Sequence, residues 1–145
     1  MLTTNQKGAV AETAIVHAAV QLGIGVWWPV SGHERYDLIF DFGSKLMRVQ
    51  CKMATRRGSV LSVRLYRCRR TATGLLKRVY SADEADAFAA FSPETGRCYY
   101  LDMADFAGHT EASLRLEPTR NNQNAGIRWA RDYEFAATLE ALLGP

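Results

Sequence analysis

Three polar side chains in one short stretch of the chain have the types and spacing to do chemistry on a phosphate. Asp37 stands at the start of an apolar run, and Gln50 and Lys52 close a second apolar run two residues apart. Because successive side chains of a strand point to opposite faces, Gln50 and Lys52 share a face. Burying a carboxylate, an amide and an ammonium group costs free energy unless each has a partner. A hydrated divalent cation and a phosphate would supply both kinds of partner.

These residues lie on a predicted β-hairpin. The apolar runs 36–40 and 46–52, joined by a glycine-containing stretch, have the pattern of two strands and a turn. Strands are also expected at 25–30, 60–67 and 113–117, and a second hairpin at 87–91 and 97–101. A long helix should begin near residue 5 and end near residue 22, and a closing helix should cover 129–143.

The first helix should pack on the sheet through an apolar stripe. The stripe recurs every four residues and is widened by two neighbours: Val10, Ala14, Ala18 and Leu22, with Ala11 and Ile15. Candidates for the N-cap lie at 3–5, and Gly23 is the expected stop. Glu12 lies beside this stripe.

The pair Tyr36-Asp37 followed by Gln50-Cys51-Lys52 resembles the core motif of the PD-(D/E)XK nucleases. The resemblance is to the small branch that contains group I intron homing endonucleases, in which Gln replaces the acidic residue of the motif. It covers residues 5–102 and implies an α/β fold of restriction-endonuclease type, with a mixed central sheet flanked by helices. We expect a single domain over 1–145, with its core at 5–102 and a C-terminal extension at 103–145.

The resemblance also implies a set of catalytic residues, namely Glu12, Asp37, Gln50 and Lys52. In this family the first helix contributes a Glu to the metal site, and Glu12 occupies that place. The implied ligands of Mg²⁺, or of Mn²⁺ in its place, are Asp37, Glu12 and the backbone carbonyl of Cys51. Lys52 would orient the attacking water and offset charge in the transition state. An amide binds metal only weakly, so Gln50 leaves open whether the site holds one ion or two.

Basic residues are concentrated in one part of the chain. The stretch 45–80 contains 11 of the 18 basic residues and no acidic residue, although the net charge of the whole chain is only +3. Such a run repels itself unless an anion offsets it, which indicates a nucleic acid. Arg64 shares the polar face of a predicted strand that is suited to the major groove, and most of the others should contact phosphates. The predicted DNA-binding residues are Arg35, Arg56, Arg57, Arg64, Arg67, Arg69, Arg70, Lys77 and Arg78.

Composition excludes several other classes of protein. With 145 residues, 48% of them hydrophobic, the chain can bury a core. No stretch approaches the roughly 20 apolar residues that span a membrane, and no signal-peptide core is evident. A cytoplasmic, nucleoid-associated protein is therefore expected. Cys51, Cys68 and Cys98 are scattered and form no CxxC pair, which argues against a disulfide framework or a zinc site.

Together these features predict an Mg²⁺-dependent, site-specific deoxyribonuclease that cuts double-stranded DNA at a long site, as an intron-encoded homing endonuclease does. A Holliday-junction resolvase or a restriction-like nuclease of the same fold is one alternative. A non-catalytic DNA-binding protein on a decayed nuclease fold is an alternative from another class. One active site makes one cut, so cleavage of both strands would require a homodimer or a homotetramer.

Overall fold

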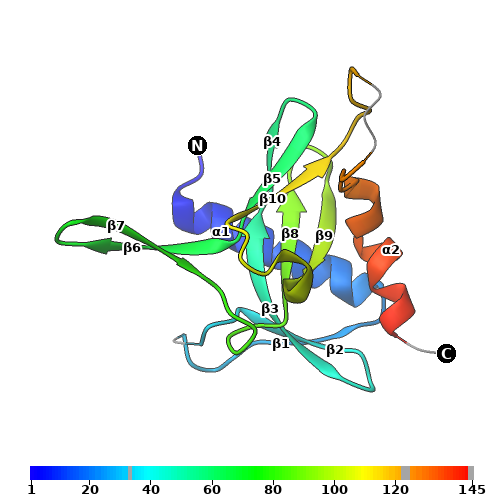
Figure 1. Cartoon of the computed structure of the whole chain (residues 1–145). Helices are drawn as coiled ribbons and strands as arrows, with labels where there is room; N and C mark the ends of the chain where they lie inside the picture. Colours follow the sequence, from blue (N-terminus) through cyan, green and yellow to red (C-terminus); the bar gives the residue numbers. More distant parts are fainter. Residues whose placement is uncertain (33, 122–124, 144–145) are drawn as a thin grey trace.

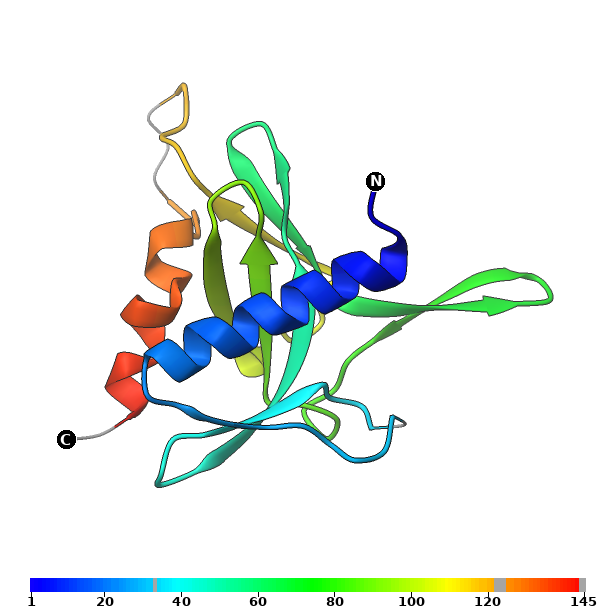
Figure 2. The ribbon, with the colours of Figure 1, turned by 180° about the vertical axis from the view of Figure 1, so that it is seen from behind.

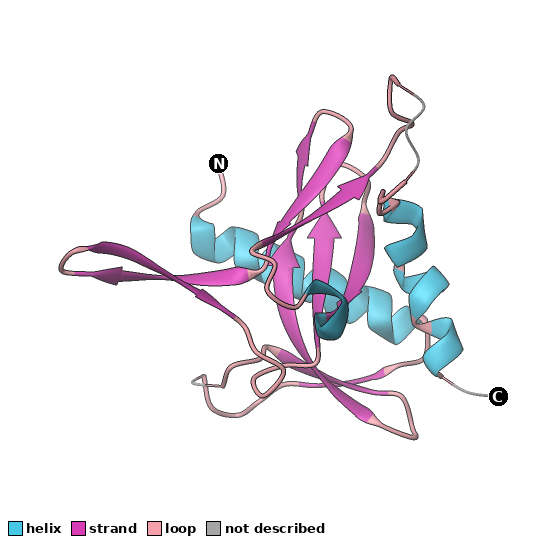
Figure 3. Cartoon of the chain, viewed as in Figure 1, coloured by secondary structure: helices cyan, strands magenta, loops and turns pink. Residues whose placement is uncertain are grey.

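The computed structural model describes residues 1–32, 34–121 and 125–143, and for 67–70 and 77 it describes the backbone alone. Figure 3 shows the helices and strands of this part of the chain. The strands are β1 (Gly25–Trp27), β2 (Leu38–Asp41), β3 (Leu46–Met53), β4 (Thr55–Arg57), β5 (Val60–Arg64), β6 (Tyr66–Thr71), β7 (Gly74–Val79), β8 (Ala87–Ser92), β9 (Arg97–Asp102) and β10 (Glu111–Arg115). The helices are α1 (Thr4–Gln21) and α2 (Phe135–Thr138), and the 3-10 turns are η1 (Met103–Phe106), η2 (Ala130–Tyr133) and η3 (Glu140–Leu142).

A five-stranded sheet with the order β1-β2-β3-β8-β9 lies at the centre of the described part of the chain. β2 and β3 form the predicted hairpin, in which Leu38 lies opposite Val49. β8 and β9 form the second predicted hairpin, and β3 runs parallel to β8. The sheet therefore contains both parallel and antiparallel pairs, which confirms the predicted mixed α/β fold. The helix α1 crosses one face of this sheet (Figures 1 and 2).

Two smaller sheets accompany the central one. β10, β5 and β4 form a three-stranded sheet that covers the face opposite α1. β6 and β7 pair only with each other among the described residues. In Figures 1 and 2 this two-stranded hairpin projects away from the rest of the molecule, and we refer to residues 66–79 as the arm.

The start of α1 follows from local hydrogen bonds. The N-cap is Thr3: its hydroxyl accepts from the Gln6 backbone N–H at 3.1 Å, and the Gln6 side chain accepts from the Thr3 N–H at 2.8 Å. This reciprocal pair is a capping box, which satisfies two donors at the helix start. The helix ends at Gln21 as predicted, before Gly23, whose φ of 83° suits a residue without a side chain.

The buried face of α1 is centred on Ala11, Ile15 and Ala19. The predicted stripe is therefore displaced around the helix, and Val10 is 37% exposed. The small side chains of Ala11 and Ala19 let the helix lie close to the sheet, whereas the larger Val10 lies at the margin of the contact. Glu12 directly follows Ala11 and therefore lies at the edge of this buried face.

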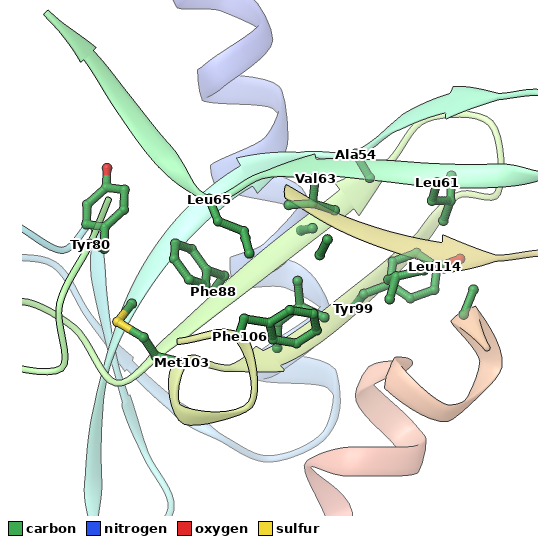
Figure 4. Close-up of a cluster of buried hydrophobic side chains, with 14 of the residues drawn as sticks. Ala54, Leu61, Val63, Leu65, Tyr80, Phe88, Tyr99, Met103, Phe106 and Leu114 are labelled. Carbon is green, nitrogen blue, oxygen red and sulfur yellow. The ribbon is translucent and has the colours of Figure 1, made fainter. Parts of the chain in front are cut away.

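Hydrophobic cores lie on both faces of the central sheet because its inner strands alternate between them. In β8, Phe88 and Ala90 belong to the core beneath β5 and β10, while Ala87 and Ala89 belong to the core beneath α1. Figure 4 shows the first of these cores, with residues of β5, β8, β9 and β10 interdigitated. Burial on both faces explains why these strands read as continuous apolar runs in the sequence.

The predicted strand at 60–67 is divided in the structure. It breaks at Leu65, which is buried, and the Leu65 N–H donates to the Thr110 carbonyl at 3.0 Å. The chain leaves the three-stranded sheet at this point and begins the arm. Residues 71–74, which have the composition of a turn, form the tip that returns β7 against β6.

The prediction of one continuous closing helix at 129–143 is wrong. Only the four residues of α2 are α-helical, between the turns η2 and η3. Glu134 interrupts the helix because its backbone is extended (ψ 149°) and bridges to Tyr99 of β9. Its carboxylate also pairs with Arg97 at 2.9 Å. Pairing with β9 therefore overrides the helical pattern. The C-terminal segment, through β10 and α2, contributes to both cores rather than lying apart.

No helix among the described residues is both long and apolar enough to cross a membrane.

The β2–β3 hairpin offers a matched test of burial. Leu38 is fully buried at 0% exposure, whereas Leu46 on the same hairpin is 62% exposed. We expect Leu38→Ala to lower the free energy of unfolding by about 2–5 kcal/mol, because it leaves a cavity under α1. Leu46→Ala should change it by no more than about 0.5 kcal/mol. Urea unfolding followed by circular dichroism measures both values, and equal losses would contradict this packing.

Candidate active site

The carboxylate of Asp37 is fixed at the open end of the β2–β3 hairpin. Its backbone N–H donates to the Val49 carbonyl at 2.9 Å, which extends the antiparallel ladder one residue beyond β2. Its Oδ2 accepts a hydrogen bond from the Cys51 backbone N–H at 2.8 Å. Asp37 is thus held across β3 by both backbone and side chain, and a charged acceptor bonded to an amide is among the stronger hydrogen bonds in proteins.

Glu12 of α1 and Cys51 of β3 converge on Asp37. One carboxylate oxygen from each acid and the Cys51 Sγ all lie within 4.8 Å of one another, and all three residues are partly buried. Burial and the negative charge of Asp37 raise the pKa of Glu12, and a hydrogen bond with the Trp28 side chain lowers it. Two carboxylates that disfavour each other's ionisation are arranged to receive a cation, which relieves the repulsion. Their chemistry and proximity fit a divalent metal ion.

The thiol of Cys51 is a member of this group that sequence reasoning missed, since only the Cys51 carbonyl was predicted to bind metal. Burial, followed by the charges of Asp37 and Glu12, raises the pKa of the Cys51 thiol. Strand alternation could have found it. Cys51 shares a face with Val49, which packs under the helix that carries Glu12.

Lys52 and Gln50 lie on the face of β3 opposite Cys51. Their register partners in β8, Ala90 and Phe88, belong to the core on that side. The Lys52 Nζ donates to the Tyr66 carbonyl at 3.2 Å and lies 5.1 Å from the centre of the Tyr80 ring. The structure therefore brings Glu12 and Asp37 together beside Cys51 of β3. Gln50 and Lys52 flank Cys51 in β3 and lie on its opposite face.

An open cleft of about 480 Å³ adjoins this group. It is lined by residues of α1, β3, β4 and β5 and by Tyr66 at the start of the arm. The charged side chains in its lining are all basic: Lys7, Lys52, Arg57 and Arg64. Lys7 was not predicted, although it lies near the start of the same helix as Glu12. The cleft has the charge needed to receive a polyanion.

The predicted DNA-binding residues fall into three groups. Arg57 and Arg64 line the cleft and are exposed. Arg35, Arg56 and Arg78 are exposed but already paired with acids. The side chains of Arg67, Arg69, Arg70 and Lys77 lie outside the described part of the structure, which places their backbones in the arm.

The paired arginines meet acids that are distant in sequence. Glu84 binds Arg35 at 3.1 Å and Arg78 at 3.2 Å, and its own side chain is only 11% exposed. Arg56 binds Glu117 at 3.2 Å. Glu84 thereby joins Arg35, in the loop before Asp37, to Arg78, near the end of β7. Sequence reasoning did not predict these pairs because it treated the acidic C-terminal part of the chain separately.

Arg48 provides a further connection to the same segment. Its backbone N–H and its guanidinium bind Asp86, at 2.7 Å and 3.1 Å, and its guanidinium also donates to the Ala82 and Asp83 carbonyls. Arg48 was not singled out from the sequence. It fixes the segment that carries Glu84 against β3, the strand that carries Gln50 and Lys52.

The fold and this group of side chains define a nuclease of the α/β class. The chain belongs to the PD-(D/E)XK endonuclease family, whose model matches residues 2–136. Among solved structures, a bacterial homing endonuclease, I-Ssp6803I, superposes with a TM-score of 0.79 and 23% sequence identity, over 98% of this chain and 94% of the other. At this identity the likeness bears on the fold. A comparison with curated proteins gives no match.

The repulsion between Glu12 and Asp37 predicts a stabilising substitution. Because the pKa of Glu12 is raised, ionising it opposes folding, so its contribution to stability is lost as the pH rises through that pKa. Glu12→Gln should raise the melting temperature at about pH 8 without divalent metal, and the gain should shrink toward about pH 4. Thermal melts followed by circular dichroism test this, with the exposed Glu34→Gln as the control. A gain that is independent of pH would contradict the assigned cause.

Proposed function

We propose that the protein is a metal-dependent endonuclease that cuts double-stranded DNA at a long, specific site. The observation that carries the proposal is the convergence of Glu12 and Asp37 on Cys51, which with Lys52 lines a basic cleft of a PD-(D/E)XK chain. Hydrolysis of a phosphodiester needs an activated water, neutralisation of charge on the phosphate and help for the leaving oxygen. The residues at this site supply candidates for each need.

Asp37 and Glu12 would hold Mg²⁺ or Mn²⁺, and the carbonyl of Cys51 would add a further oxygen. A bound ion would supply an activated water and offset charge on the transferring phosphorus. The hydrogen bond from the Cys51 N–H to Oδ2 keeps the Asp37 carboxylate oriented. Neutral Gln50 in place of a third acid supports a site with a single ion.

Lys52 would act on the phosphate and the attacking water. Its ammonium group lies in the cleft and is fixed by the Tyr66 carbonyl, so it meets an incoming phosphate at a defined place. A positioned cation that faces developing negative charge stabilises the transition state without reorganisation. Gln50, on the same face of β3, would orient a water or a phosphate oxygen through its amide.

The arm and the cleft would read the DNA. Arg57 and Arg64 line the cleft, and β6 and β7 carry Arg67, Arg69, Arg70 and Lys77 on a two-stranded ribbon of the kind that enters a major groove. Arg35, Arg56 and Arg78 would contact phosphates. The named function of I-Ssp6803I, a homing endonuclease, supports a long target and an intron-encoded origin. One site per chain makes one cut, so we propose a homodimer or a homotetramer for cleavage of both strands.

Cleavage of a randomised duplex pool and of a four-way junction, with Mg²⁺ or with a chelator, tests the function. We expect metal-dependent paired cuts at one long, partly symmetric motif. Asp37→Ala and Lys52→Ala should each lower the cleavage rate by at least about 100-fold. The exposed residues Asp132 and Lys45 provide matched controls as Asp132→Ala and Lys45→Ala.

The outcomes separate the alternatives. Cuts confined to the junction would replace this proposal with a resolvase. Salt-sensitive binding with no cleavage under any metal would replace it with a non-catalytic DNA-binding protein.

The Glu84 pairs predict how charge controls DNA binding. Glu84→Gln should release Arg35 and Arg78 for phosphates, so affinity at low salt should rise and the dependence of log K on log salt should steepen by about one unit. Fluorescence anisotropy with a labelled duplex across a salt series measures both quantities. Glu140→Gln, at an exposed position, makes the same change in net charge. Equal effects of the two substitutions would show that net charge alone, and not the release of these arginines, is responsible.

A further inference from the structure

Lys52 contacts the first residue of the arm and the residue that directly follows the arm. Tyr66, whose carbonyl accepts from the Lys52 Nζ at 3.2 Å, is the first residue of β6. Tyr80, whose ring centre lies 5.1 Å from the same nitrogen, directly follows the last residue of β7. Tyr66 pairs with Val79 in the arm, so these two contacts come from adjacent backbones. The place where the arm joins the molecule is thus also the place where the Lys52 ammonium group is held.

The ring of Tyr80 is a fixed partner. Tyr80 is only 7% exposed and lies edge-to-face with Phe88 of β8, with ring centres 5.6 Å apart at 79°. Figure 4 shows it at one end of the core, near Phe88 and Met103. A buried ring in this geometry cannot turn without disturbing the core, so its π face stays directed at Lys52.

We propose that Tyr80 is a positioning residue for Lys52, and that with the Tyr66 carbonyl it makes the attachment of the arm part of the active site. The inference rests on the proposed function, because it takes Lys52 as the residue that meets the phosphate. An ammonium group over an aromatic face is attracted by the negative potential of the ring, more strongly where water is partly excluded. The ring and the carbonyl together define where the positive charge lies before DNA arrives.

The arrangement has a consequence for how recognition and cleavage are connected. Tyr66 and Tyr80 stand where the arm joins the molecule, so the arm and Lys52 share these two residues. A target that leaves this junction undisturbed keeps the ammonium group in place, and a target that moves the Tyr66 carbonyl away from the fixed Tyr80 ring displaces it. Tyr80 contributes to the rate of cleavage in this scheme and not to the affinity for DNA.

Cleavage kinetics with Tyr80→Phe and Tyr80→Leu test the role of the ring. Tyr80→Leu removes the π face and should lower kcat by about 5- to 30-fold, with KM and metal-free DNA affinity within about twofold of wild type. Tyr80→Phe keeps the face and should retain the wild-type rate. Tyr133→Leu is the matched control, since Tyr133 also packs on an aromatic ring, that of Phe106. Equal rates for Tyr80→Leu and wild type, or a loss shared by Tyr80→Phe, would overturn the proposal.

A second measurement does not depend on cleavage. In protein labelled with ¹³C,¹⁵N-lysine, the side-chain methylene signals of Lys52, assigned with Lys52→Arg, should show an upfield ring-current shift that Tyr80→Phe keeps and Tyr80→Leu removes. Lys52 signals at the positions of an exposed lysine in the wild-type protein would overturn the proposal even if Tyr80→Leu fails to fold. If the wild type shows the shift but cuts no DNA, the contact with Tyr80 stands and the proposed nuclease function fails.

Discussion

The register of β2 against β3 is the constraint on which the rest of the site depends. With Leu38 opposite Val49, both leucine and valine face α1, and Asp37 falls one residue beyond the paired strand, where its carboxylate meets the Cys51 N–H. A slip of one residue would move the whole apolar set of the strand to the other face, so the buried core enforces the register. The position of the Asp37 carboxylate is therefore a consequence of hydrophobic packing between the hairpin and the first helix.

Both faces of β3 carry residues of the candidate site. The face toward α1 carries the Cys51 thiol into the group formed with Glu12, and the opposite face carries Lys52 toward the arm. β2 begins at Leu38, opposite Val49, so the last four residues of β3 extend beyond the part of the strand that pairs with β2. The cleft begins at this end of β3.

Much of this was predictable because the signals are local. The hairpin and the first helix follow from alternation and capping chemistry within about 20 residues. The motif residues were identified through their resemblance to a nuclease family. The division of the strand at Leu65 and the extended backbone at Glu134 were not predictable from local signals. Each is decided by a partner that is distant in sequence, namely Thr110 for Leu65 and Tyr99 for Glu134. A single sequence gives no direct information on such pairings.

Partners that are distant in sequence also determine how charge is distributed. The sequence shows a basic stretch at 45–80 without acidic residues, followed by a part that contains most of the acidic residues. In the folded chain, Glu84, Asp86 and Glu117 from the acidic part return to pair with arginines at the borders of the site. Lys7, Arg57 and Arg64 instead line the cleft beside Lys52. Among the side chains that the structure describes, these acid–arginine pairs border the candidate site, while the lining of the cleft is basic. A cleft with a positive potential favours the entry of a polyanion. The acidic C-terminal part of the chain therefore shapes the charge around the candidate site as well as building the core.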